Sequence, residues 1–313
     1  MLLDSASGLD RPELSAVGVC DVPPSLSLEG DASPGLDVGP LVSATDLVRV
    51  HDPASSLFSY NLVRTEQGLD FEVPDAAVQQ LQALGLGQLA TLRPHGLPGG
   101  RQQPPAELPE DADDYADFVQ ALVERYDGDG VEDMPGLELP ITAWEIDNEP
   151  AMALEDPNLY VDLVEVTAAA IREADPEARI LIGGAAPIVG EDDAARDHIE
   201  RFWGALFELG ALDHVDIFNL HAPVGAHLDP AALVRAWEEL DAPRGLPWWI
   251  TEAGHSDPVE DGQVHEDIPA QAEWMDTWLT GALAEVDVVL ICDAQSLVEE
   301  PLLLDVIAAH NGR

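Results

Sequence analysis

The sequence predicts an α/β protein that forms one closed (β/α)8, or TIM, barrel with an irregular first unit. Three observations predict this fold class. Short apolar runs alternate with amphipathic helical segments, eight such runs can be counted, and no G-x-G-x-x-G turn follows any of them in the 313 residues. Alternation of this kind implies a parallel sheet, and eight units favour a closed barrel over an open doubly wound sheet. The missing glycine motif weakens a dinucleotide-binding alternative.

The first unit is the irregular one. Residues 1–45 form an N-terminal segment, in which 16–20 is the expected first strand. The segment that follows, to Pro40, is rich in Pro, Gly, Ser and Asp, which is typical of a long loop. We expect no helix between residues 21 and 46, and we assign the remainder of the barrel to residues 46–313.

From residue 46 onward, strands and helices alternate. Apolar residues at helical spacing, as in Ala77, Val78 and Leu81, identify the helices, and Gly85 ends the first of them. The expected strands are 47–51, 86–92, 141–149, 180–184, 215–221, 247–252 and 286–292. The expected helices are 74–84, 113–126, 157–174, 192–209, 230–240, 268–284 and 301–309.

The charge balance is strongly acidic. Asp and Glu number 61 against 13 basic residues, all of them arginine, which gives a formal net charge of −48. Such a surface repels itself in dilute buffer, whereas molar salt shortens the Debye length to about 3 Å. We therefore expect a halophilic protein from a high-salt cytoplasm. Nucleic acid is not expected as a partner, because phosphate contacts need a basic patch.

Targeting signals are missing from the sequence as given. It has no run of 18 apolar residues, so no membrane partner is expected. The first ten residues lack a basic region and a sustained apolar stretch, which predicts a cytoplasmic protein; an additional N-terminal leader would make it secreted. Cys20 and Cys292 end the first and last strands, which are neighbours in a closed barrel. A disulfide between them stays open, with reduced thiols the default in a cytoplasm.

Two of the expected strands end on a glutamate. The largely apolar run that starts at Ile141 ends on Asn148 and Glu149, and the run that starts at Pro247 ends on Glu252. The carboxyl ends of all strands meet at one rim of a (β/α)8 barrel, so both glutamates are expected there. Two carboxyl groups at one site can divide the work of an acid and of a nucleophile.

These motifs resemble those of the clan A retaining glycoside hydrolases, of the family 39 and family 5 type. W-x-I-x-N-E-P at 144–150 and W-I-T-E-x-G at 249–254 carry the resemblance, and it covers roughly residues 46–293. The resemblance implies a glycoside hydrolase that acts on a β-linked glycoside or oligosaccharide by a two-glutamate double displacement. It implies a carbohydrate substrate and no cofactor, and it leaves the oligomeric state open.

The resemblance also implies roles for individual residues. Glu149 is the expected general acid/base and Glu252 the nucleophile, with Asn148 bound to the sugar 2-hydroxyl. Arg49 is expected beside Glu252, where its charge keeps the carboxylate ionised. His221, at the end of the sixth strand, is expected to line the same pocket.

Two positions depart from the family pattern. Pro223 replaces a tyrosine that usually follows the sixth-strand histidine, and Cys292, Asp293 and Ala294 stand where a tryptophan platform is usual. Asp293 itself is expected to reach the rim and contact the substrate. The departures keep a non-catalytic carbohydrate-binding barrel, or a degenerate glycosidase-like barrel, as the alternative.

A metal-dependent hydrolase is a third hypothesis. His51, His221 and Asp293 could supply ligands at strand ends, although no H-x-H or H-E-x-x-H spacing supports this. The acidic loop 127–133 does not match an EF-hand, because Val131 and Glu132 occupy its fifth and sixth positions. We expect an acidic surface turn there, with an irregular cation site as the alternative, and no metal ligands at the active site.

Overall fold

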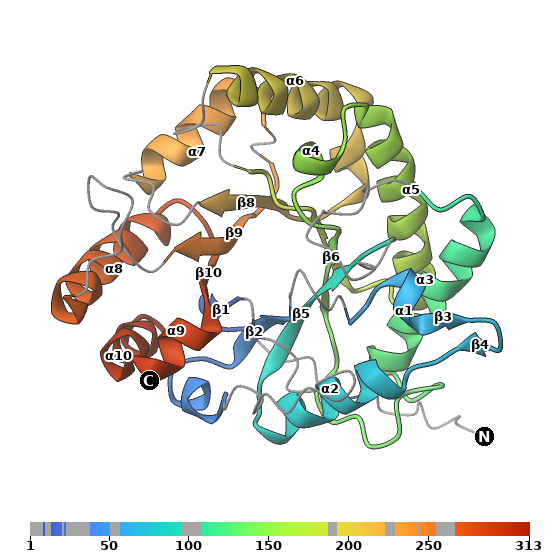
Figure 1. Cartoon of the computed structure of the whole chain (residues 1–313), viewed down its shortest axis with the longest axis horizontal. Coiled ribbons are helices and arrows are strands. Elements are labelled where there is room, and N and C mark those ends of the chain that lie inside the picture. Colours follow the sequence, from blue (N-terminus) through green and yellow to red (C-terminus); the bar gives the residue numbers. More distant parts are fainter. Residues whose placement is uncertain are drawn as a thin grey trace, which may run out of the picture.

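A computed structural model describes residues 9, 14–20, 22, 38–50, 57–94, 108–186, 193–222, 229–242, 245–254 and 267–313. Its centre is one eight-stranded sheet in which every strand pair is parallel (Figure 1). The strands are β1 (Val17–Val19), β2 (Leu47–Val50), β5 (Gly87–Leu92), β6 (Ala143–Ile146), β7 (Arg179–Ile182), β8 (Phe218–Ala222), β9 (Trp248–Gly254) and β10 (Val288–Cys292).

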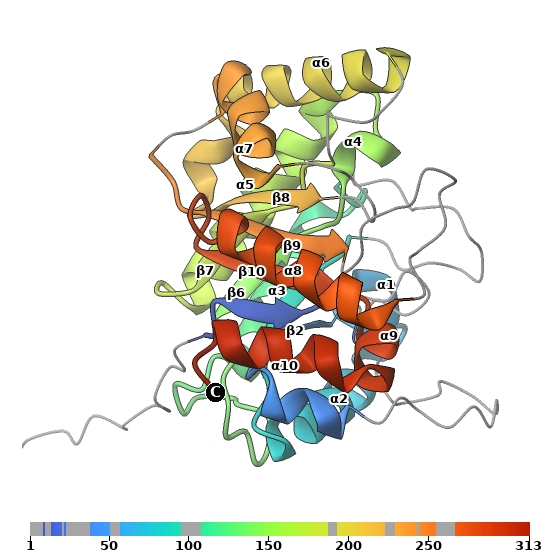
Figure 2. The same ribbon diagram turned by 90° about the vertical axis from the view of Figure 1, so that its left-hand side faces the viewer.

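The sheet closes on itself. Its order is β7-β6-β5-β2-β1-β10-β9-β8, and parallel bridges from Leu181 to Ile217 and from Ala185 to Leu220 join the two ends. In the side view the arrows of β8 and β9 point the same way (Figure 2). The predicted single (β/α)8 barrel is therefore confirmed, with each strand near its expected place. Two bounds are wrong by three residues, since β6 ends at Ile146 and not at Glu149, and β8 begins at Phe218 and not at Val215.

In the described ranges, seven long helices surround the strands, and each lies within two residues of its predicted bounds. Side chains of Asp111 and Asp156 cap two of them by accepting from the backbone amides of Asp114 and Asn158. Two others begin with a proline, Pro230 and Pro301, which suits the first helical turn. The helices are α2 (Glu72–Ala83), α3 (Ala112–Tyr126), α5 (Pro157–Ala174), α6 (Asp193–Leu209), α7 (Pro230–Glu239), α8 (Ile268–Ala282) and α10 (Pro301–His310).

The short elements outside the barrel were not predicted, because helices of four to six residues are too short to show a helical period and strands of two residues are too short to show a strand period. They include a 3-10 helix, η1 (Gly39–Ser43), which corrects the expectation of no helix between residues 21 and 46. Pro40 at its start and the buried Leu41 explain why it forms. The others are α1 (Tyr60–Val63), β3 (Arg64–Thr65), β4 (Gly68–Leu69), α4 (Pro150–Ala153), η2 (Ala211–His214) and α9 (Ala294–Glu299).

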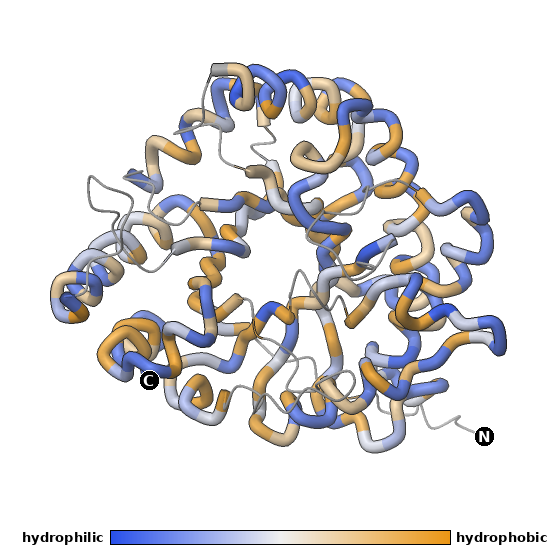
Figure 3. The backbone as a smooth tube through the Cα atoms, viewed as in Figure 1, coloured by the Kyte–Doolittle hydropathy of each residue, from blue (hydrophilic) through white to orange (hydrophobic). Residues whose placement is uncertain are grey.

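The buried apolar residues form two layers, because strand side chains alternate between two faces. The outer layer lies between the strands and the helices and contains Val48, Trp144 and Ile250. The inner layer fills the barrel and contains Leu47 and Trp249, among others. Along the outer helices, hydrophobic and hydrophilic positions alternate (Figure 3). Among the described helices, none has the length and apolar content needed to cross a bilayer.

The seam between β1 and β10 joins residues far apart in the sequence. Cys20 and Cys292 are paired there as a disulfide, with their Cα atoms 4.9 Å apart, so the reduced thiols expected by default are not what the structure has. The Asn311 side chain accepts from Val17 N over 3.0 Å and donates to Val17 O over 2.7 Å. It also donates to Ala44 O over 2.9 Å, which fixes β1 to the segment before β2.

Candidate active site

An irregularity in β9 directs Glu252 into the barrel mouth. Leu220 of β8 pairs with Ile250, but the next residue, His221, pairs with Glu252, so Thr251 is an additional residue in β9. The register to β10 shifts at the same place. In a regular strand, consecutive side chains point to opposite faces. The bulge allows Thr251 and Glu252 both to contact residues of the barrel interior, as bulges beside functional sites often do.

A left-handed backbone turn directs Glu149 to the same place. Asp147 has φ 60° and Glu149 has φ 43°, a region that costs a non-glycine residue about 1–2 kcal/mol. The surroundings hold this turn, since Asp147 N donates to Leu92 O over 2.8 Å and Tyr160 donates its hydroxyl to Ile146 O over 2.6 Å. The turn ends β6 and places Glu149 above the end of the strand.

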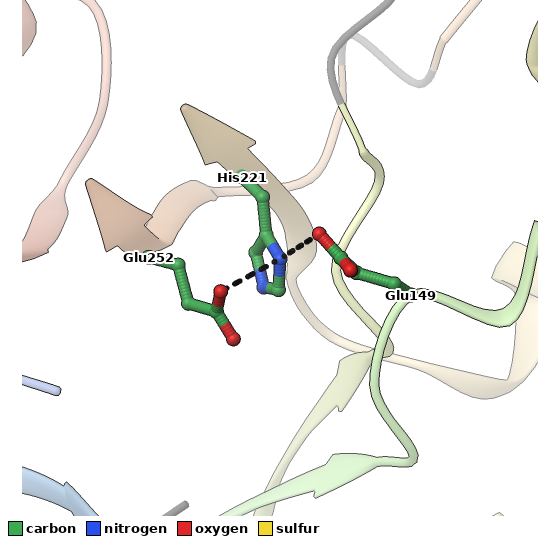
Figure 4. Close-up of side chains that lie close together, drawn as sticks. All are labelled: Glu149, His221 and Glu252. Carbon is green, nitrogen blue, oxygen red and sulfur yellow. Dashed lines mark hydrogen bonds and ion pairs between the residues drawn. The ribbon is translucent and has the colours of Figure 1, made fainter. Parts of the chain in front are cut away.

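Glu149, His221 and Glu252 lie together at the rim (Figure 4). His221 Nδ1 is 2.9 Å from Glu149 Oε1 and 3.5 Å from Glu252 Oε2, so the imidazole stands between the two carboxylates. These three residues each offer one atom within 4.8 Å of the other two. The side chains of Glu149 and Glu252 are 26% and 25% exposed, whereas that of His221 is 3% exposed. Both carboxylates are therefore partly open to solvent, whereas the imidazole is not.

Arg49 is fully buried and connects three acceptors. Its Nη1 donates to Glu252 Oε1 over 2.7 Å, and its Nη2 donates to Asn148 Oδ1 over 2.6 Å. Its Nε donates to Oε2 of Glu145 over 2.7 Å. The structure thus brings together five of the residues singled out from the sequence: Arg49, Asn148, Glu149, His221 and Glu252.

The charges at the rim act on one another. Burial alone would raise the pKa of Glu252, but the charges of His221 and Arg49 hold that pKa below its ordinary value. Burial would lower the pKa of His221, but Glu252 and Glu149 raise it overall. Glu252 is therefore favoured as an anion near neutral pH, which is the state that a nucleophilic carboxylate needs.

A layer of polar residues below the rim was missed from the sequence. Glu145 accepts from Thr91 Oγ1 over 2.6 Å and from Asn219 Nδ2 over 2.6 Å, and Thr251 Oγ1 donates to Asn219 Oδ1 over 2.9 Å. A period-two pattern could have revealed the layer, because each polar residue stands two positions after an inward apolar one. The pairs are Leu89 and Thr91, Ala143 and Glu145, Ile217 and Asn219, and Trp249 and Thr251.

Asp293 occupies a different position from the rest of the set. It caps α9, where Oδ1 accepts from Ser296 N over 2.8 Å and Oδ2 accepts from Ser296 Oγ over 3.2 Å. Its contact with a substrate stays a prediction. His51, a possible metal ligand, and Pro223, which stands where a tyrosine is usual, lie outside the described residues.

Within the part of the chain that the structure describes, two groups of side chains have the composition of metal ligands. Glu149, His221 and Glu252 form one, but the guanidinium of Arg49 lies 2.7 Å from Glu252 and disfavours a cation there. Asp127, Asp129 and Asp133 form the other. These three carboxylates accept from backbone amides of their own loop, which is the pattern of an acidic turn.

No protein-family profile matches the sequence, and no curated protein does either. Solved structures do resemble it. A glucosidase from Croceicoccus marinus is 15% identical with a TM-score of 0.61, over 98% of this chain and 68% of that one. A GH10 xylanase from Thermobacillus composti is 16% identical with a TM-score of 0.58, over 95% and 96%. A GH39 β-xylosidase from Caulobacter crescentus is 18% identical with a TM-score of 0.59, over 92% and 64%.

These similarities define the class of fold. The chain has the (β/α)8 barrel that these glycoside hydrolases share, and the resemblance predicted from its sequence motifs is confirmed at the level of the fold. Identities of 15 to 18% carry the comparison no further than the fold.

Proposed function

We propose that the protein is a retaining glycoside hydrolase that acts on a β-linked glycoside or oligosaccharide. The observation that carries the proposal is the approach of one Glu149 carboxylate oxygen to within 4.8 Å of one from Glu252. Retaining glycosidases hold their two carboxyl groups about 5–5.5 Å apart, whereas inverting ones hold them about 6.5–9.5 Å apart to admit a water molecule. The close approach supports the retaining geometry.

The environments of the two carboxylates support a division of work. Glu252, paired with Arg49, attacks the anomeric carbon as an anion and forms a covalent glycosyl-enzyme. Glu149 protonates the leaving oxygen in this step. In the second step Glu149 takes a proton from the water that releases the sugar. Asn148, oriented by Arg49 through its Oδ1, binds the sugar 2-hydroxyl.

The structural neighbours support a carbohydrate substrate. They are named as a glucosidase, xylanases, a β-xylosidase and β-1,4-galactanases. Several different sugars occur in these names, so a panel of sugars is needed to find the substrate of this chain.

The test is hydrolysis of a panel of aryl β-glycosides in molar salt, with Glu252→Ala and Glu149→Ala compared with wild type. Glu252→Ala should lower kcat by roughly 10⁴-fold or more, as the loss of a nucleophile does. Glu149→Ala should lower it by about 10²–10⁴-fold on substrates with poor leaving groups, and far less on good ones, which need no acid. Glu155→Ala is a suitable control, because that side chain is 97% exposed.

Two outcomes contradict the proposal. In the first, the wild type cleaves no glycoside on the panel. This result would favour the alternative, a non-catalytic carbohydrate-binding barrel or a degenerate glycosidase-like barrel. In the second, both glutamate variants keep full activity. Labelling of Glu252 by a fluorosugar that traps the covalent intermediate would identify the nucleophile directly.

A further inference from the structure

We propose that Glu145 is a positioning residue: an ionised carboxylate below the rim that orients Arg49 and, through Asn219 and Thr251, fixes the proton on Nε2 of His221. Glu145 touches no substrate in this role, which rests on the proposed function of Glu149 and Glu252. The buried charge of Glu145 is thus linked to the nucleophile through Arg49 and to the acid/base through His221.

Glu145 is surrounded by donors. Its side chain is fully buried, and its Oε2 accepts from Arg49 Nε over 2.7 Å and from Thr91 Oγ1 over 2.6 Å. Its Oε1 accepts from Asn219 Nδ2 over 2.6 Å, with Thr251 Oγ1 3.3 Å away. An ionised carboxylate only accepts hydrogen bonds, so it fits this shell. A protonated carboxyl group or a glutamine amide would place a donor against donors.

The direction of each following hydrogen bond is then determined. Asn219 donates its Nδ2 to Glu145, so its Oδ1 faces Thr251 and can only accept. Within the described part of the chain, the Thr251 hydroxyl donates to this Oδ1 over 2.9 Å. A hydroxyl has one hydrogen, and Thr251 uses it here. At 3.2 Å from His221 Nε2, Thr251 Oγ1 must therefore accept, and Nε2 must carry the hydrogen.

The fixed proton on Nε2 determines what His221 presents to the acid/base. In a neutral ring, Nδ1 is then the basic nitrogen, and it faces Glu149 Oε1 at 2.9 Å. At this distance the unprotonated Nδ1 can accept a hydrogen bond from the carboxyl group of Glu149. The other charged groups that face His221 are Glu252 at 3.5 Å, Glu145 at 4.0 Å and the guanidinium of Arg49. The opposite tautomer would leave Nε2 without a donor.

The first experiment reads the tautomer without any substrate. Nitrogen NMR of the protein labelled with ¹⁵N-histidine, with His221→Asn used to assign the signal, should show neutral His221 protonated on Nε2. Thr251→Val removes the acceptor of that proton, and the Nδ1-protonated form should appear. Thr167→Val is the matched control, since this hydroxyl is equally buried but donates to Leu163 O in α5. A wild-type ring protonated on Nδ1 would overturn the proposal.

The second experiment reads the pH profile of kcat/KM for Glu145→Gln and Thr251→Val. Both should lower kcat/KM about 10-fold or more, part of the 10²–10⁴-fold that a positioned acid/base contributes, and should move a limb of the profile. Thr167→Val should leave the limbs in place. If the pH profile keeps both limbs in place in Glu145→Gln and in Thr251→Val, the positioning role is contradicted, even if less folded protein is obtained. If the wild type has no activity, the proposed function fails while the tautomer measurement still decides the role of Glu145.

Discussion

Arg49 and Glu252 form an ion pair, 2.7 Å between Nη1 and Oε1, in which the guanidinium is fully buried and the carboxylate reaches solvent. The same guanidinium binds Glu145 on its buried side. One positive charge thus serves two carboxylates on different strands, so its removal affects both the fold and the site.

Arg49→Met should lower the free energy of unfolding by about 3–5 kcal/mol, because it leaves two buried or half-buried carboxylates uncompensated. Urea unfolding in molar salt measures the loss. Arg64→Met provides the control: Arg64 pairs with Asp114 at 2.7 Å but is 38% exposed, and such pairs contribute about 0–1 kcal/mol. Equal losses for the two variants would mean that burial of the Arg49 pair has no special effect.

Gly184→Ala should displace His221. A Cβ atom at this position would lie 1.9 Å from His221 Nε2, so the ring must move and its contacts with Thr251 and Glu149 must break. We expect a loss of glycosidase activity and about 1–3 kcal/mol of stability, as overpacking costs elsewhere. In Gly204→Ala, in α6, the new methyl group meets no atom within 4 Å. That variant should keep its activity and gain about 0.5–1 kcal/mol. Full activity in Gly184→Ala would show that the ring position is unimportant.

Asp147→Asn should change how stability depends on pH. Burial raises the pKa of Asp147 from 3.8 to about 6, although Arg93 opposes the shift. Between these values the folded protein binds more protons than the unfolded chain, so wild-type stability falls as pH rises from about 4 to 6. Asparagine tolerates the left-handed φ of 60° and does not titrate.

The difference in unfolding free energy between Asp147→Asn and wild type should therefore grow over this range. At 1.36 kcal/mol per pKa unit, the growth is up to about 3 kcal/mol. Urea titrations at several pH values measure this difference. An effect of the substitution that does not depend on pH leaves the slope of the difference against pH unchanged. A difference that is independent of pH would contradict the prediction.

Salt should stabilise the fold. With a net charge of −48, the folded chain repels itself, and the Debye length shortens from about 10 Å at 0.1 M to 3 Å at 1 M. The midpoint of thermal unfolding should rise through this range of KCl concentration. Sucrose at equal osmolality is the control, because it does not screen charge. A midpoint that stays constant or falls with KCl would count against a halophilic protein.

Chelation should leave activity unchanged, because the proposed double displacement uses two carboxylates and no metal. The assay is hydrolysis of the best aryl glycoside after incubation with EDTA, with calcium-saturated EDTA as the control. A loss of activity that added Zn²⁺ or Ca²⁺ reverses would instead support the metal-dependent hypothesis.

The parts of the structure with a local signal were predictable. A strand of the barrel needs a short apolar run and a helix needs an apolar stripe, so all eight strands and seven long helices could be placed. Glu149 and Glu252 could be found because each interrupts an apolar run at its end. Their convergence required only the rule that parallel strands share one rim.

The polar layer could not be read from a single strand. Glu145 alternates with Trp144 and Ile146, which in an open sheet indicates a solvated face. Closure of the ring makes that face an interior without bulk water, and it comes from pairing between distant segments. The additional residue in β9 is equally non-local, since Thr251 is defined as a bulge only by its neighbours in β8 and β10.

The seam at β1 has a consequence for biosynthesis. Residues 17–19 pair with β10, and Val17 is bound by Asn311, 294 positions later in the chain. During translation, β1 can pair on one side only, with β2, until these later residues have left the ribosome. The ring stays open until then, and Glu145 and Arg49 stay in contact with water. Assembly of the candidate active site therefore waits until nearly the whole of residues 17–311 has been made.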